Sequence, residues 1–150
     1  MPSHRLVHRS LTLLTLATLA ACSDGGSPEQ QVRAVIEQME QAAENRDIGE
    51  LASHLSADYR DANGMDAEEA GRYARGYFIA NQSIHLLTRI EDLTFPTDGE
   101  ARAQVLVGML GRDAGASDQW DLAAEVHTFK IALRREDDEW KVSFLEVMRK

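Results

Sequence analysis

Cysteine and long hydrophobic runs are the most informative scarcities of this sequence. Cys22 is the single cysteine among 150 residues, so no intramolecular disulfide can form and the folded part carries no thiol nucleophile. The main apolar stretch, residues 11–20, covers about half of the roughly 20 residues that a membrane-spanning helix needs. Neither disulfide bonds nor a transmembrane helix is therefore expected.

Positive charge is also scarce. The chain has 16 lysines and arginines against 25 aspartates and glutamates, a formal net charge of -9. Residues 1–21 contain two of the arginines and no acid, so the chain without them has a formal charge of -11. An acidic surface repels nucleic acids and anionic lipid head groups, so we expect no nucleic-acid partner.

Several motifs that carry chemistry are missing. The sequence has no glycine-rich phosphate loop, no nucleophile elbow and no His-Glu-x-x-His pattern. His54 and His85 have no partner at the spacing of metal ligands. We therefore expect neither a metal site nor a cofactor.

The first 21 residues follow the order of a secretory signal: a basic segment, an apolar segment, small residues and a break. The cleavage region reads Leu19-Ala20-Ala21-Cys22 and resembles the bacterial lipoprotein box of an aliphatic residue, two small residues and a cysteine. This resemblance implies cleavage between Ala21 and Cys22 and lipidation of Cys22 by acyl chains such as palmitate. The alternative is an ordinary signal peptide with a cysteine at that position.

A lipidated Cys22 would make the membrane the first partner of this chain, because more than one acyl chain anchors a protein stably. The resemblance then implies a lipid-anchored protein of the bacterial cell envelope that faces the periplasm. Ser23 lacks the acidic character that retains some lipoproteins in the inner membrane, so the outer membrane is preferred. Residues 22–27 form a short tether, which leaves residues 28–150 as one domain close to the membrane.

Three helices are expected between residues 28 and 81. Ser27, Asp47 and Asp66 are each followed three residues later by glutamine or glutamate, which is the capping pattern at a helix start. Apolar residues then recur at steps of three and four. In the first helix this stripe is Val32, Val35, Ile36, Met39 and Ala43, and the opposite, solvent face takes Arg33, Glu37, Glu40 and Glu44.

After Ser83 the pattern alternates, which predicts four long strands at about residues 84–95, 101–109, 120–135 and 140–148. The third of these changes its apolar phase near Val126, which predicts a bulge or a strong bend there. Three helices followed by such strands indicate an α+β fold. We expect the helices to pack on one face of a curved antiparallel sheet.

Three stretches carry a family resemblance: RDIGELASHLSADYRD, HLLTRIEDLTF and LRREDDEWKVSFLEV. They are similar to the nuclear transport factor two family, and the resemblance covers residues 28–150. It implies a cone-shaped, cystatin-like roll, the fold shared by steroid isomerases, polyketide cyclases and many exported bacterial proteins. That fold hosts enzymes, ligand binders and assembly domains alike, so the resemblance does not select among them.

Two sets of residues are candidates for proton-transfer chemistry. Asp61 lies where steroid-isomerase-like relatives carry a base aspartate, although Ala62 replaces the proline common there, and its alternative role is to bond the backbone of the turn before Asn63. Glu125 and His127 are two apart on an expected strand, so they share a face and can act as a pair. A bulge at Val126 would instead turn Glu125 to solvent. Tyr73, Tyr77 and Phe129 are expected to line a cavity or to fill the core.

The function favoured by these observations is a non-enzymatic envelope lipoprotein whose domain binds a small apolar ligand or a protein partner. One alternative is an isomerase- or cyclase-like enzyme that transfers a proton in the cone cavity. Another is an accessory subunit of an envelope assembly. A second copy of the chain is a further partner, through an outer sheet face expected to contain Leu106, Leu110, Leu145 and Val147.

Overall fold

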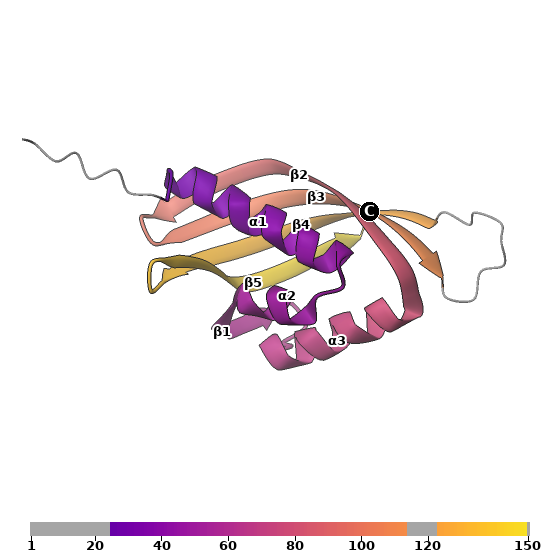
Figure 1. The fold of residues 1–150 in the computed structure, drawn as a ribbon. Coiled ribbons are helices and arrows are strands. Elements are labelled where there is room, and N and C mark those ends of the chain that lie inside the picture. The colour runs from indigo at the N-terminus through magenta and orange to yellow at the C-terminus, as the bar shows by residue number, and fades with distance from the viewer. Residues whose placement is uncertain (1–24, 114–122, 150) are drawn as a thin grey trace, which may run out of the picture.

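A computed structural model describes residues 25–113 and 123–149 (Figure 1). The predicted signal peptide, Cys22 and most of the tether lie outside the described residues, as does Trp120. Among the described residues, no helix is both long and apolar enough to cross a membrane. The elements in chain order are α1 Pro28–Glu44, α2 Ile48–Ser53, β1 Leu55–Asp61, α3 Ala67–Ala80, β2 Asn81–Thr97, β3 Glu100–Asp113, β4 Ala123–Glu136 and β5 Glu139–Arg149.

The helix starts agree with the capping pattern of the sequence. The Ser27 hydroxyl accepts a hydrogen bond from the Gln30 backbone N–H at 3.2 Å, and the Gln30 side chain accepts from the Ser27 N–H at 2.9 Å. Asp66 and Glu69 make the same reciprocal pair at the start of α3. Asp47 caps α2 by accepting from the Glu50 N–H at 2.9 Å. These bonds satisfy N–H groups that have no partner inside a helix.

The sheet has five strands in the order β1-β5-β4-β3-β2, and the helices cover one of its faces (Figure 1). The predicted α+β class is confirmed, with four long antiparallel strands. The short β1 was not predicted, and it pairs parallel to β5, which makes the sheet mixed. The burial of β1 does not alternate along its length, so its sequence lacks the period of two by which a strand is predicted.

The bulge lies in a different strand from the predicted one. β3 and β4 pair without a register shift from Glu100 to Gly111, so the expected bulge near Val126 is absent. The shift occurs in β5 instead, where Ser143 has no partner between the pairs Leu133–Val142 and Ala132–Phe144. One extra residue turns the rest of a strand over. Leu145 and Val147 therefore face the helices, opposite Ile131 and Phe129, and do not belong to the outer sheet face.

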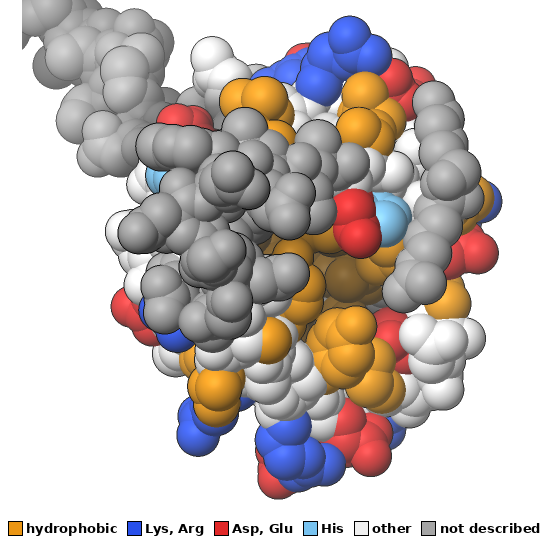
Figure 2. Space-filling view, turned by 90° about the vertical axis from the view of Figure 1, so that its right-hand side faces the viewer, with side chains coloured by type: hydrophobic (Ala, Val, Ile, Leu, Met, Phe, Trp, Pro, Cys, Tyr) orange, Lys and Arg blue, Asp and Glu red, His pale blue; other side chains and the backbone are white. Residues whose placement is uncertain are grey.

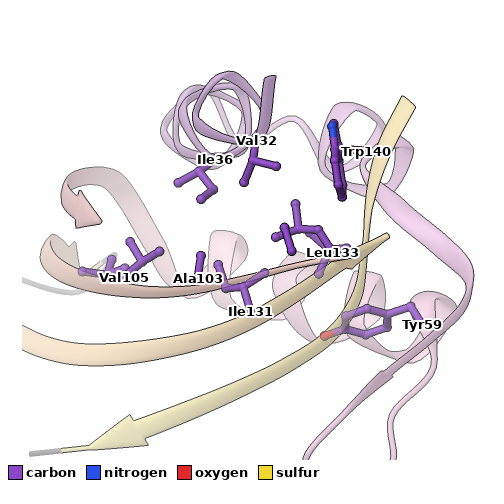
Figure 3. Packing of buried hydrophobic residues seen from close by; sticks show 11 residues of the cluster. Val32, Ile36, Tyr59, Ala103, Val105, Ile131, Leu133 and Trp140 are labelled. Atoms are coloured by element: carbon purple, nitrogen blue, oxygen red, sulfur yellow. The ribbon is translucent and has the colours of Figure 1, made fainter. Parts of the chain in front are cut away.

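The core lies between α1 and the covered face of the sheet. Figure 3 shows Val32 and Ile36 pointing from α1 towards Leu133 on β4. Trp140 packs against the same cluster and donates a hydrogen bond from its indole nitrogen to Gln31 on α1 at 3.0 Å. Tyr59 from β1 belongs to this cluster at 2% exposure, and burial together with the charge of Asp61 raises the pKa of Tyr59 to about 12.

A charged network spans β4 and β1. Arg134 donates to the Ser56 hydroxyl at 2.7 Å and to the Asp58 carboxylate at 2.8 Å, and it also pairs with Glu136. Ser56 is 1% exposed and donates to Glu136 at 2.7 Å. The hydrogen bonds from Ser56 and Arg134 lower the pKa of Glu136. The buried hydroxyl therefore has a partner, and β1 is fixed beside the longer strands.

Candidate functional site

One end of the covered sheet face carries the polar groups of the candidate site. We call this end the mouth; it comprises residues 81–88 of β2, 107–113 of β3 and 123–129 of β4. Figure 2 views the molecule from this end and shows hydrophobic side chains around a hollow, with acidic and histidine side chains at its edge. An apolar hollow with a few polar groups is typical of small-molecule sites.

Glu125 and His127 lie together in the mouth, as the sequence predicted for an unbulged strand. The unshifted register places Glu125 opposite Met109 and His127 opposite Val107, so both share the face of the buried strand residues. His127 Nε2 lies 3.0 Å from Glu125 Oε2. The His127 side chain is 9% exposed and that of Glu125 is 65% exposed, so the carboxylate reaches water while the ring does not.

The other nitrogen of His127 has no hydrogen-bond partner among the residues that the structure describes. Nδ1 is the one buried side-chain polar atom among the described residues without a partner. A carboxylate only accepts hydrogen bonds, so in the neutral ring Nε2 carries the proton and Nδ1 presents a lone pair. An unpaired buried polar atom costs stability, so it needs an explanation in a folded protein. Nδ1 is suited to accept a proton or hydrogen bond from a molecule in the mouth.

A second polar pair lies in the same cross-strand row as His127. Thr88 is opposite Val107, which is opposite His127, so the three side chains share a face. The Thr88 hydroxyl donates to Glu40 Oε2 on α1 at 2.5 Å. Two strand spacings separate Thr88 from His127, or about 10 Å. The row therefore has a polar group at each end and an apolar residue between them.

The sequence pattern placed Glu40 and Glu44 on the solvent face of α1, but in the structure both side chains bond to β2. Glu40 reaches Thr88, and Glu44 Oε1 accepts from the backbone N–H of Leu86 on β2 at 2.8 Å. The sequence contained the signal, because Glu40 follows Ile36 by four residues and so continues the buried Val32–Ile36 ridge. β2 is an edge strand, and Glu44 satisfies one of its outward backbone groups.

Asp61 lies in the turn between β1 and α3. Its carboxylate accepts from the backbone N–H of Asn63 at 2.9 Å and of Met65 at 2.8 Å, and from the Asn63 side chain at 3.2 Å. Gly64 in this turn has a φ of +87°, a conformation that glycine adopts most readily. This geometry is the turn-capping role that the sequence offered as the alternative, and the carboxylate is engaged by its own turn.

The three predicted cavity-lining aromatic residues have different positions. Phe129 is half-buried on the inner face of β4, two residues from His127. Tyr77 is half-buried on α3 and makes an edge-to-face contact with Phe78 at 6.5 Å between ring centroids. Tyr73 does not fit the predicted role, because its side chain is 65% exposed. Tyr73 lies at the edge of the apolar stripe of α3, and the buried residue of this helix is Phe78, in its last turn.

The described residues contain no group of three or more His, Cys, Asp or Glu side chains placed to hold a metal ion. His54 pairs with Glu50 on α2 at 3.1 Å, and His85 lies 4.0 Å from Glu44. Each of these pairs joins one histidine to one carboxylate. They are interactions within or between elements, and neither adjoins His127 in the sheet register.

Neither any known family model nor any curated protein sequence matches this chain. Solved structures do match it. A protein proposed to be a scytalone dehydratase from Novosphingobium aromaticivorans superimposes with a TM-score of 0.74 at 13% identity, covering 81% of this chain and 83% of that one. A proposed dehydratase of the NTF2-like family from Streptomyces avermitilis gives 0.69 at 15% identity, covering 81% and 96%.

The domain has the NTF2-like cone fold. The hexachlorocyclohexane dehydrochlorinase LinA type 3 from Novosphingobium barchaimii shares it, with a TM-score of 0.69, 16% identity and coverage of 81% and 86%. At these identities the likeness establishes the fold and leaves the activity open. The cone-shaped fold that the resemblance implied is thus confirmed.

Proposed function

We propose that this chain is an exported lipoprotein whose cone domain binds a small, mainly apolar ligand at the mouth. The observation that supports the binding site is the buried, unpartnered Nδ1 of His127. A ligand hydroxyl or N–H that donates to Nδ1 would satisfy the one buried acceptor that the described protein leaves open. Val107 and Phe129 beside it supply apolar contact, and Thr88 with Glu40 supplies polar groups at the far end of the row.

The experiment is to purify the native lipidated protein from its own envelope and to identify by mass spectrometry what accompanies it. The expected companion is a small molecule with an apolar body and at least one hydrogen-bond donor. The matched sample is the His127→Leu protein, which should lose that molecule. A companion retained equally by both proteins would place the ligand elsewhere and remove His127 from the proposal.

A second candidate function is proton transfer, supported by the Glu125–His127 contact of 3.0 Å. A carboxylate that holds the ring and stabilises its protonated form is the arrangement of a general base. Solved neighbours include proteins named as dehydratases and a dehydrochlorinase, which are enzymes. Glu125→Gln separates the two candidates, because the amide oxygen can accept the same bond yet cannot stabilise an imidazolium. It should preserve ligand binding and abolish turnover of that ligand.

We propose that the lipid on Cys22 holds the domain at the outer membrane, facing the periplasm. The support is the sequence Leu19-Ala20-Ala21-Cys22 after a signal-like segment. We expect the wild-type chain to partition into the detergent phase of a phase-separating detergent and Cys22→Ser to move to the aqueous phase, because a serine oxygen does not receive the thioether-linked lipid. The acidic domain has no other strong attraction to anionic membranes. A Cys22→Ser protein that stays in the detergent phase would contradict the lipid anchor.

We also propose that a second copy of the chain covers the outer sheet face. Leu145 and Val147 face inward, so they do not belong to the predicted set on this face. The exposed large apolar side chains of the outer face are instead Leu87 at 69% exposure, Val126 at 47% and Phe144 at 38%. Leu87 and Val126 lie in one row with Gly108 between them. Residues 27–150 should therefore elute as a dimer at micromolar concentration and Val126→Glu as a monomer. Elution of the unchanged sequence as a monomer would remove this proposal.

A further inference from the structure

A pocket of about 390 Å³ lies between α3 and the turn that joins α1 to α2. Its volume is within the range of small-molecule sites. None of its described lining residues lies on a strand, so its lining does not include His127, Thr88 or Glu125. Its lining residues are Asn45, Arg46, Ile48, Arg75, Phe78 and Ile79.

Arg75 faces this pocket because of its place on α3. Gly71, Arg75 and Phe78 follow one another at helical spacing and share a face. A Cβ on Gly71 would lie 4.0 Å from the Ile48 side chain, so this face packs against α2. Arg75 has no hydrogen bond or ion pair with another described residue. Arg72, one turn earlier, pairs with Glu68 at 2.5 Å.

Arg46 places a second guanidinium at the pocket. Its φ of +59° is a left-handed conformation that glycine would adopt more readily, so the position retains a long cationic side chain against the preference of its backbone. Arg46 Nη2 donates to the Phe78 carbonyl at 2.5 Å, which holds the guanidinium against the last turn of α3. The neighbouring carboxylate of Asp47 is engaged in capping α2.

Apart from Asn45, the remaining lining of the pocket is apolar and partly open to solvent. Ile79 is 70% exposed, one turn from Arg75, whereas Phe78 is 7% exposed and forms the floor. Two cations therefore lie beside an exposed apolar side chain, in a chain with 25 acidic and 16 basic residues. We propose that this pocket binds one molecule of an amphiphilic anion, a carboxylate or phosphate head group joined to a short hydrocarbon chain. The guanidiniums pair with the head group and Ile79 covers the chain.

The test is calorimetric titration of the full chain, in a neutral detergent, with octyl phosphate and separately with inorganic phosphate. Each guanidinium makes a charge-assisted contact, so Arg75→Gln and Arg46→Gly should each weaken octyl phosphate binding at least about ten-fold. Glycine suits the backbone at position 46, so this variant removes the guanidinium without straining the turn. Arg72→Gln is the matched control, because it removes the same charge from the same helix outside the pocket and should bind as the unchanged chain does.

Ile79→Asn tests the hydrocarbon part of the proposal, since it should weaken binding of octyl phosphate and leave inorganic phosphate unaffected. If inorganic phosphate bound as tightly as octyl phosphate, the hydrocarbon chain would contribute nothing to binding. That result would overturn the proposal of an amphiphilic ligand and leave a simple anion site. Equal binding by Arg75→Gln, Arg46→Gly and the unchanged chain would overturn the pocket itself. The same variants are also sedimented with phosphatidylcholine vesicles that contain phosphatidate. Arginine-dependent binding to these vesicles without binding of octyl phosphate would show a membrane surface as the partner and overturn the single-molecule site.

Discussion

Replacing His127 by leucine should stabilise the protein while it removes ligand binding. His127 is 7% exposed and its Nδ1 has no partner in the described part of the chain, and such a buried atom costs about 1–3 kcal/mol. Leucine is similar in size and has no polar atom, so we expect the free energy of unfolding to rise by about 1 kcal/mol. The released Glu125 regains water, because its side chain is already 65% exposed. Urea denaturation measures the gain.

The control for this variant is His85→Leu, because the His85 side chain is 73% exposed and lies on the outer face opposite Leu110. It should change the free energy of unfolding by less than about 0.5 kcal/mol and keep the ligand. A stabilised His127→Leu protein without ligand would mean that the native residue is retained for function at a cost in stability. Destabilisation by more than about 1 kcal/mol would contradict this, since it would make His127 a packing residue.

The parts of the fold that the sequence predicts depend on local interactions. Ser27, Asp47 and Asp66 cap their helices through bonds to residues three positions ahead, so each helix start is readable in a short window. The same holds for the long strands, whose alternation reflects one buried and one exposed face. These features need no knowledge of the distant parts of the chain.

The features that the sequence did not predict depend on distant partners. β1 is a strand because Leu55 pairs with Val142, far along the chain. The bulge at Ser143 turns Leu145 and Val147 inward, and the sequence carries a weak trace of it, because Phe144 and Leu145 are adjacent apolar residues and Glu146 breaks the alternation. Alternation alone does not show which residue lacks a cross-strand partner. The prediction therefore placed Leu145 and Val147 on the outer face of the sheet, whereas they lie on the inner face.

Part of the candidate site could likewise be predicted from the sequence, and part depends on residues that are distant in the chain. That Glu125 and His127 share a face follows from their spacing of two, and the unshifted register of β4 keeps them together. The unpartnered state of Nδ1 depends on every group packed around the ring, which spacing does not contain. Glu40 is intermediate, because its place four residues after Ile36 was visible, whereas its bond to Thr88 requires α1 to lie against β2.

Replacing Leu133 by alanine should cost about 3 kcal/mol of the free energy of unfolding. Leu133 is 1% exposed and lies between Ala101 on β3 and Val142 on β5, beneath α1. Ala101 is too small to fill the space that the substitution opens, so the loss includes a cavity as well as the transferred atoms. Chemical denaturation should show a lower midpoint with an unchanged slope.

Leu87→Ala removes the same atoms from a side chain that is 69% exposed in the single chain, so in the Val126→Glu background, where no second copy covers it, it is the matched control and should cost less than about 0.5 kcal/mol. Leu133 lies six residues along β4 from His127, away from the mouth. The folded fraction of Leu133→Ala should therefore bind the ligand with unchanged affinity, in contrast to His127→Leu, which is expected to be more stable and unable to bind. A loss of affinity in both variants would mean that the mouth and the core respond as one packed unit, and His127 would then have no separate part in binding.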